Sequence, residues 1–180
     1  AKLQLGGDFT ITPQYDKAHL NGVSTFDLVQ IQKHILGTKL LTDPYQIIAA
    51  DVNNSRTITT IDLIQVRKLV LGLEDRFASV PSWKFIPVAY KFPNPSNPWQ
   101  EEFPQVINVN DLKDKASSDF VGIKMGDVNG SATSSSATAG TLRSNQALHI
   151  KAERLNQTEH NFKAGESLTV ALTSAELAAV

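Results

Sequence analysis

The chain has 180 residues, a formal net charge of −1 and no cysteine. This length accommodates one or two domains with a core of their own. The near-neutral charge provides no basic field that would recruit nucleic acid or an anionic membrane surface. The absence of cysteine excludes disulfides, thiol catalysis and zinc–thiolate sites. No apolar run in the sequence reaches the roughly twenty residues of a membrane span.

Residues 1–13 contain a Gly-Gly turn followed by an alternation of apolar and polar residues at Phe9 and Ile11. This alternation predicts a β-strand. Because a single strand is not stable alone, it either pairs with a later segment or belongs to a preceding domain. We assign residues 1–13 to the last strand of a preceding β-domain.

The next segment combines a polar loop with an amphipathic helix pattern. The loop, DKAHLNGVSTFD, has a carboxylate at each end, Asp16 and Asp27. Apolar residues then recur at helical spacing as far as Gly37, which marks the end of a helix. Further on, Asp43 and Pro44 precede YQIIAA. They predict the N-cap and the first position of a short helix.

Residues 51–72, DVNNSRTITTIDLIQVRKLVLG, have the pattern of a calcium loop followed by a helix. In a twelve-residue calcium loop, positions 1, 3, 5, 7, 9 and 12 provide the oxygens, with position 7 using its carbonyl and position 9 often a water. Ca²⁺ is a hard cation that several oxygens must surround. The residues at these positions, which we predict as calcium ligands, are Asp51, Asn53, Ser55, Thr57, Thr59 and Asp62.

Two departures from the usual loop leave a second interpretation open. Arg56 stands at position 6, where the sharp turn normally uses glycine. Asp62 stands at position 12, where the usual pattern has the longer glutamate. The alternative to a metal site is a polar turn that only caps a helix, with Thr59 as the N-cap and Asp62 in the first turn.

The loop-and-helix segments 16–37 and 51–72 are copies of each other. GVSTFDLVQIQKHILG aligns with TITTIDLIQVRKLVLG at an offset of thirty-five residues, which indicates an internal duplication. In the first copy Asp16, Gly22 and Asp27 stand at positions 1, 7 and 12. Positions 3 and 5 hold alanine and leucine, which have no side-chain oxygen. The first loop is therefore either an incomplete calcium site or a relic of the duplication.

This arrangement resembles the dockerin type I family over about residues 16–73. The resemblance rests on two loops that end in aspartate, two helices that end in Leu-Gly, and a short helix between them. It implies a calcium-folded module that binds a cohesin domain and so attaches one extracellular protein to another. The fold class that we predict is α+β, a dockerin-like pair of repeats with an added β segment, flanked by strands of neighbouring sandwich domains.

Residues 77–130 form an extension that bare dockerins lack. Its first part is rich in proline, and alternating runs at 83–86, 88–92 and 106–109 predict edge strands or extended segments. The aromatic side chains of this part either form a face for stacking on sugars or pack against the repeat helices. Because each ring buries a large area, we favour packing. These aromatic residues are Trp83, Phe85, Tyr90, Phe92, Trp99 and Phe103.

The end of the extension, FVGIKMGDVNGS, contains half of a further loop. Asp127, Asn129 and Ser131 have the spacing of positions 1, 3 and 5, but no helix and no acid at position 12 follow. We hypothesise that Asp127 and Asn129 fold back to complete a calcium site with Asp16 and Asp27. The alternative is an ordinary Asn-Gly turn that leads into a linker.

The remaining residues predict a linker and the start of another domain. Residues 131–141 are rich in Ser, Ala, Thr and Gly. They have little to bury and predict a domain boundary. Residues 142–180 alternate around Leu148 and Leu168, as strands do, and resemble the start of a cohesin-like or immunoglobulin-like β-sandwich. Residues 14–130 are then the dockerin-like module.

The predicted function is binding, and not catalysis. The chain has no Ser-His-acid spacing, Gly-rich phosphate loop or HExxH motif, so we expect no enzyme activity in it. We expect Ca²⁺ and a protein partner, a cohesin-like or other β-sandwich domain that lies in the same chain, a neighbouring copy or another protein. We also expect an extracellular or cell-surface location in a bacterium.

A calcium-rigidified spacer or filament subunit that binds no cohesin is the alternative function. The two functions differ in what the repeat helices do with their outer faces. A recognition module should expose the helix faces around Lys33, Arg67 and Lys68. A spacer should bury both helices against residues 77–112.

Overall fold

The computed structural model describes residues 6–112, 118–133, 148–150 and 168–171. The described elements, in chain order, are β1 (Phe9–Gln14), α1 (Thr25–Ile35), α2 (Pro44–Ala50), α3 (Thr60–Val70), β2 (Trp83–Pro87), β3 (Ile107–Val109), β4 (Phe120–Lys124), β5 (Leu148–Ile150) and β6 (Leu168–Ala171). The predicted mixture of α and β structure is confirmed. The predicted linker beyond residue 133 lies outside the described residues, as does the predicted sandwich start apart from β5 and β6.

The helices begin and end where the local sequence places them. Asp43 caps α2, because its Oδ1 accepts the N–H of Tyr45 at 2.8 Å, and Pro44 is the first helical residue. Gly37 and Gly72 follow α1 and α3, each with a φ of 68°. This left-handed conformation, which glycine adopts without a steric penalty, lets the chain leave a helix. The prediction of two repeat helices with a short helix between them is confirmed.

The described strands form two three-stranded sheets, ordered β3-β1-β6 and β2-β4-β5. In the first sheet β1 pairs antiparallel with β3, with Phe9 opposite Val109, and parallel with β6. In the second sheet β4 pairs antiparallel with β2, with Trp83 opposite Lys124, and antiparallel with β5. The sequence offered β1 either a later segment of the same chain or a preceding domain as its partner, and we assigned residues 1–13 to the latter. In the structure β1 pairs instead with later segments of the same chain.

The proline-rich extension contains β2 and β3, which match two of its three predicted runs. The third run, residues 88–92, was expected to be extended, and this expectation is wrong. The N–H of Tyr90 donates to the carbonyl of Pro87 at 2.9 Å, so the chain turns there. The apolar residues of this run serve ring packing and not a strand. The ring of Phe92 packs edge-on against the rings of Tyr45 and Tyr90.

The aromatic residues of the extension divide between two hydrophobic clusters. Tyr90, Phe92, Trp99 and Phe103 are partly buried and pack against the main core, which includes residues of all three helices. Trp83 and Phe85 pack with Phe120 in a second cluster of their own. The preference for packing is therefore confirmed, although only the first group packs with the helices.

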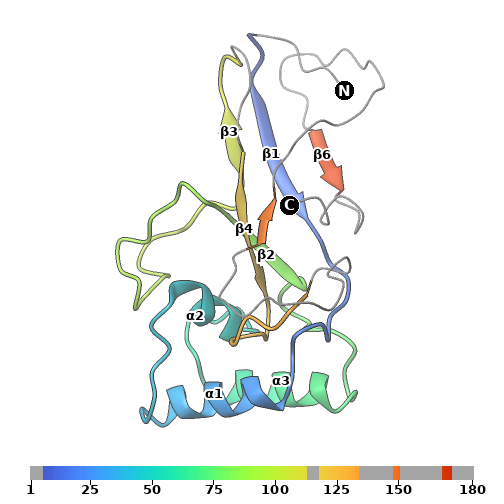
Figure 1. Ribbon diagram of the computed structural model, residues 1–180, viewed down its shortest axis with the longest axis vertical. Coiled ribbons are helices and arrows are strands. Elements are labelled where there is room, and N and C mark those ends of the chain that lie inside the picture. Colours follow the sequence, from blue (N-terminus) through green and yellow to red (C-terminus); the bar gives the residue numbers. More distant parts are fainter. Residues whose placement is uncertain (1–5, 113–117, 134–147, 151–167, 172–180) are drawn as a thin grey trace.

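The main core lies between the helices and the β2–β4 pair. Buried side chains from all these elements contribute to it, including Ile31, Ile48, Val66, Ile86 and Ile123. Figure 1 shows α1 and α3 at one end of the molecule, with α2 between them and the strands, and with β1 and β3 extending toward the other end. No helix in the described part of the chain is long and apolar enough to cross a membrane.

Candidate metal centre

The loop of residues 51–62, which we call the contiguous loop, turns both of its carboxylates inward. Asp51 and Asp62 are only 1% and 0% exposed. Oδ1 of Asp51 accepts the N–H of Ser55 and Oδ2 accepts the N–H of Arg56, both at 2.9 Å. Oδ1 of Asp62 accepts the N–H of Asn53 at 3.2 Å. The first and last residues of the loop thus share its interior.

The neutral oxygens of the predicted ligand set lie in the same loop. Oδ1 of Asn53 accepts the N–H of Ser55 at 2.9 Å. The hydroxyl of Ser55 donates to the carbonyl of Thr57 at 3.0 Å and lies 3.1 Å from the hydroxyl oxygen of Thr57. Thr59 is the N-cap of α3, and its hydroxyl oxygen accepts the N–H of Ile61 at 3.3 Å. All six predicted residues therefore belong to one hydrogen-bonded loop.

The last residues of this loop also cap α3, as the alternative interpretation predicts. Oδ2 of Asp62 accepts the N–H of Thr59 at 2.9 Å and the hydroxyl of Thr59 at 3.1 Å, which completes a capping box. Capping does not use the whole carboxylate, because two carboxylate oxygens together offer about four acceptor directions. Asp62 accepts three hydrogen bonds in all, which leaves about one acceptor direction for a cation.

The contiguous loop keeps a sharp turn without the usual glycine. Asn54 and Arg56 have φ values of 61° and 63°. Residues with a Cβ pay about 1–2 kcal/mol in this left-handed region. The N–H of Arg56 bonds to Asp51 in that conformation, so the departure at position 6 leaves the turn intact and adds strain to it.

The electrostatics of the contiguous loop favour a cation. Burial raises the pKa of Asp51, and the nearby charge of Asp62 raises it further, while the N–H groups of the loop and the charge of Lys84 oppose the shift. The ammonium of Lys84 donates to Oδ1 of Asn54 at 3.0 Å. Among the described residues, no salt bridge involves Asp51, Asp62 or Lys84. Two buried like charges are costly unless a cation or a proton compensates them.

The half-loop around Asp127 folds back onto the first repeat. Oδ1 of Asp127 accepts the N–H of Ser131 at 3.1 Å, and Oδ2 accepts the N–H of Ala132 at 2.7 Å. The hydroxyl of Ser131 then donates to the carbonyl of Gly22 at 2.9 Å. Two segments separated by 109 residues of sequence are therefore in direct contact.

Asp27 joins this contact from the first turn of α1, where it is fully buried. Its Oδ1 accepts the N–H of Val128 at 3.0 Å and that of Asn129 at 3.2 Å. Its Oδ2 accepts the N–H and the hydroxyl of Ser24, at 2.8 and 3.0 Å, and so caps the helix. The structure thus gathers four of the five residues that the sequence assigned to the first site, namely Gly22, Asp27, Asp127 and Asn129.

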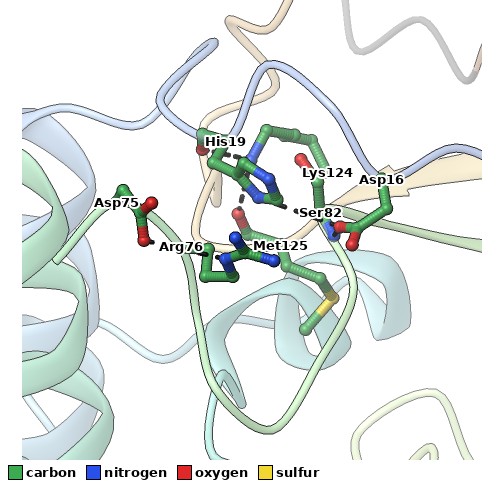
Figure 2. A network of polar contacts seen from close by, with 7 residues as sticks. All are labelled: Asp16, His19, Asp75, Arg76, Ser82, Lys124 and Met125. Atoms are coloured by element: carbon green, nitrogen blue, oxygen red, sulfur yellow. Dashed lines mark hydrogen bonds and ion pairs between the residues drawn. The ribbon is translucent and has the colours of Figure 1, made fainter.

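Asp16, the fifth residue assigned to the first site, lies elsewhere. Its Oδ1 accepts the N–H of Ser82 at 2.7 Å and lies 3.8 Å from Nδ1 of His19 (Figure 2). The Asp16 side chain is 54% exposed. Asp16 therefore contacts Ser82 and His19, whereas the carboxylate beside Gly22 and Asp27 is that of Asp127.

Lys124 places a buried positive charge beside the first site. Its ammonium donates to the carbonyls of His19 and Met125 at 2.7 and 3.1 Å (Figure 2), and the residue is 4% exposed. Burial lowers the pKa of Lys124 to about 8, against the effect of the charges of Asp127, Asp16 and Asp27. In the sequence, the only feature that singles out Lys124 is its position as a lone charge in an apolar run.

The burial of Asp127 also affects its own titration. Burial raises the pKa of Asp127, and the charge of Asp27 adds to the shift, whereas the N–H groups of residues 130–132 oppose it. Within the described residues, no group of three or more His, Cys, Asp or Glu side chains gathers around one point. Each of the two sites offers two carboxylates, so its other ligands would be amide, hydroxyl and carbonyl oxygens.

No family model, curated protein or solved structure matches this chain. The likeness to dockerins therefore rests on the sequence pattern of residues 16–73. The geometry adds a hydrogen-bonded loop at the start of each repeat helix, and the carboxylate that closes each loop, Asp27 or Asp62, is buried.

Proposed function

We propose that this chain is a calcium-binding, dockerin-like module that mediates protein association on an extracellular or cell-surface bacterial protein. The observation that carries the proposal is the pair of buried carboxylates, Asp51 and Asp62, inside one loop. Backbone N–H groups orient both carboxylates, and neither forms a salt bridge with a described residue. Ca²⁺ prefers such a set of oxygens.

The proposed role of calcium is to stabilise the folded module. Asp51 and Asp62 would supply the negative charge, Asn53 and Ser55 side-chain oxygens, and Thr57 its carbonyl. Thr59 would act through a water, as position 9 often does. Because this loop exists only in the folded protein, each bound ion would shift the equilibrium toward the native state.

The proposal of protein association is supported by an exposed apolar stripe on each repeat helix. Residues at i, i+3 and i+10 lie on one face of a helix. The stripe residues, each between 48% and 71% exposed, are Phe26, Val29 and Leu36 beside α1 and their repeat counterparts Ile61, Ile64 and Leu71 beside α3. Contiguous exposed apolar surface marks interaction sites. Of the three basic residues expected on the recognition face, Lys33 and Arg67 are exposed, whereas Lys68 is half-buried and its ammonium bonds to Glu74 at 2.9 Å. The exposure of Lys33 and Arg67 supports a recognition module over a spacer.

The experiment that tests the proposal is a binding assay with purified cohesin-type β-sandwich domains, in calcium and in chelator. We expect at least one domain to bind in calcium and to be released by chelation. The double variant Val29→Ser, Ile64→Ser should abolish binding, whereas Ala89→Ser, an exposed position outside the helices, should retain it.

Three results would overturn the proposed function in whole or in part. If calcium binds but none of the sandwich domains does, the module is the calcium-rigidified spacer of the alternative. If the chain binds no calcium at millimolar concentration, calcium dependence is wrong as well. Binding that survives in chelator would likewise separate recognition from the metal.

A further inference from the structure

The chain after Asp127 turns as the chain after Asp51 does. In both cases the aspartate accepts the N–H groups of the fourth and fifth residues that follow it. In both cases the third residue is in the left-handed region, with a φ of 61° at Asn54 and 69° at Gly130. The half-loop therefore reproduces the first half of the contiguous loop.

The second half of this loop comes from a distant part of the chain. The hydroxyl of Ser131 donates to the carbonyl of Gly22 at 2.9 Å. In the contiguous loop, the hydroxyl of Ser55 donates to the carbonyl of Thr57 at 3.0 Å. Since Thr57 is position 7 of the contiguous loop, the carbonyl of Gly22 takes position 7 of the other one.

Asp27 closes this loop as Asp62 closes the contiguous one. Each of the two carboxylates caps its helix through Oδ2. Each accepts, through Oδ1, the N–H of the third residue of the loop, which is Asn129 in one case and Asn53 in the other. Asp27 therefore stands at position 12. We call the assembly of residues 127–132 and 22–27 the split loop.

The two halves of the split loop lie side by side at the point where residues 127–132 end and residues 22–27 begin. A Cβ on Gly22 would lie 2.5 Å from the nitrogen of Ala132 and 2.6 Å from Oδ2 of Asp127, so no other residue fits there. The side chain of Asn21 accepts the N–H of Thr133 at 3.2 Å and donates to its carbonyl at 2.7 Å. These contacts place residues 21 and 22 directly against residues 132 and 133.

One polar atom of the split loop points to a ligand. Oδ1 of Asn129 is buried and accepts no hydrogen bond within the described part of the chain. Its counterpart in the contiguous loop, Oδ1 of Asn53, accepts the N–H of Ser55. A buried amide oxygen without a partner has lost its hydrogen bonds to water without replacement, which is unfavourable. Position 3 is a ligand position of calcium loops, so a cation would satisfy this oxygen.

We propose that the split loop is a second calcium site, shared by two segments of the chain. Asp127, Asn129 and Ser131 would supply side-chain oxygens, Gly22 its carbonyl and Asp27 the closing carboxylate. The inference rests on the calcium chemistry of the proposed function. Because the halves are about a hundred residues apart in the sequence, calcium here fastens the segment after β4 to the start of α1.

The test is calcium stoichiometry, measured by equilibrium dialysis on the full chain with Ca²⁺ as the only probe. We expect two ions per wild-type chain, one in Asp127→Asn and one in Asp51→Asn. Asp16→Asn, the matched control, should retain two ions because Asp16 lies outside the split loop. Circular dichroism in calcium identifies any variant that does not fold.

Asn129→Ala is a second variant, which retains both carboxylates and every backbone N–H group of the site. It should raise one of the two calcium dissociation constants by at least about tenfold and leave the other unchanged. If Asp127→Asn fails to fold, this variant decides the outcome. Wild-type binding at both sites in Asn129→Ala would overturn the inference.

The failure of this inference differs from the failure of the proposed function. One ion per wild-type chain, lost in Asp51→Asn and kept in Asp127→Asn, would overturn the split site and leave the contiguous one in place. The absence of calcium from every protein would overturn both. Loss of one ion in Asp16→Asn would return position 1 to Asp16 and reject the split loop.

Discussion

Arg56 holds a left-handed conformation, with a φ of 63°, although its side chain is exposed. Replacing Arg56 with glycine keeps the N–H that bonds to Asp51 and removes a strain of about 1–2 kcal/mol. The greater freedom of glycine in the unfolded chain offsets about 1 kcal/mol of that gain. We therefore expect Arg56→Gly to stabilise the protein by up to about 1 kcal/mol in urea unfolding.

The matched control for this prediction is Arg76→Gly. Arg76 is also exposed, but it is not among the residues with positive φ, so glycine relieves no strain there. This control should be destabilising by about 0.5–1 kcal/mol. An equal loss of stability in both variants would show that the turn at Arg56 is unstrained.

Lys124 predicts a pH dependence for the metal-free protein. Burial lowers the pKa of Lys124 to about 8 from the ordinary value of 10.5. Between these values the unfolded chain binds a proton that the folded protein has released, so the free energy of unfolding rises with pH. The full gain is at most about 3 kcal/mol.

Urea unfolding in chelator between about pH 7.5 and 9.5 measures this rise. Lys124→Met, which cannot ionise, should flatten the slope, whereas Lys91→Met should preserve it because Lys91 is exposed. A slope that is the same in wild type and in Lys124→Met would assign the pH dependence to another group.

The positions of the proposed ligand residues follow from the sequence only where the loop is unbroken. Counting from a carboxylate predicts the contiguous loop and finds Asp127 and Asn129. The same counting adds Asp16, because it assumes that one loop is one segment. Ser24, the N-cap of α1, can be identified in the sequence only through its alignment with Thr59. That the halves meet depends on tertiary packing, which no local spacing encodes.

At the scale of elements, α2 connects the repeat helices with the second sheet. Ile48 of α2 is fully buried in the main core, and the carbonyl of Ala49 accepts the N–H of Gly126, just after β4, at 2.8 Å. Ile48→Ala should therefore cost about 2–4 kcal/mol of stability. Ile61→Ala, at a position that is 56% exposed, should cost less than about 0.5 kcal/mol.

Both isoleucine variants should be unfolded in urea at the same saturating calcium concentration. This condition makes the comparison report packing and not metal affinity. A loss of similar size in the two variants would contradict the position of α2 within the core.

The helices were more predictable than the strands for a physical reason. The helices depend on local periodicity and on caps such as Asp43. The strands depend on distant partners, for example Phe9 opposite Val109, and no short-range pattern specifies that register. β4 has buried residues on both faces, so it lacks the alternation that identifies a half-exposed strand.

At the scale of the whole molecule, the split loop joins the connection by which the chain enters the helical part to the segment that follows β4. Residues 16–22 lead from β1 to α1, and residues 125–132 follow β4. The contacts of Asp27 and Ser131 join these two connections. A calcium ion there would therefore also restrain the direction in which the later part of the chain departs, beyond its effect on local stability.

The free energy of unfolding of the module should rise with the logarithm of the calcium concentration, and the slope should be proportional to the number of calcium sites. An ion that binds only the folded state adds about 1.4 kcal/mol to the free energy of unfolding for each tenfold rise in calcium above its dissociation constant. Two sites predict about 2.7 kcal/mol per decade for the wild type. Asp51→Asn and Asp127→Asn should each show about half of this slope, and the double variant should show none.

Urea unfolding at constant ionic strength measures these slopes, with magnesium in place of calcium as the ionic control. Mg²⁺ requires near-octahedral geometry and loses water reluctantly, so it should give a much smaller slope. An equal slope in magnesium would indicate general screening of the buried carboxylates. A full wild-type slope in Asp127→Asn would mean that a single loop, or a site elsewhere in the chain, accounts for the stabilisation.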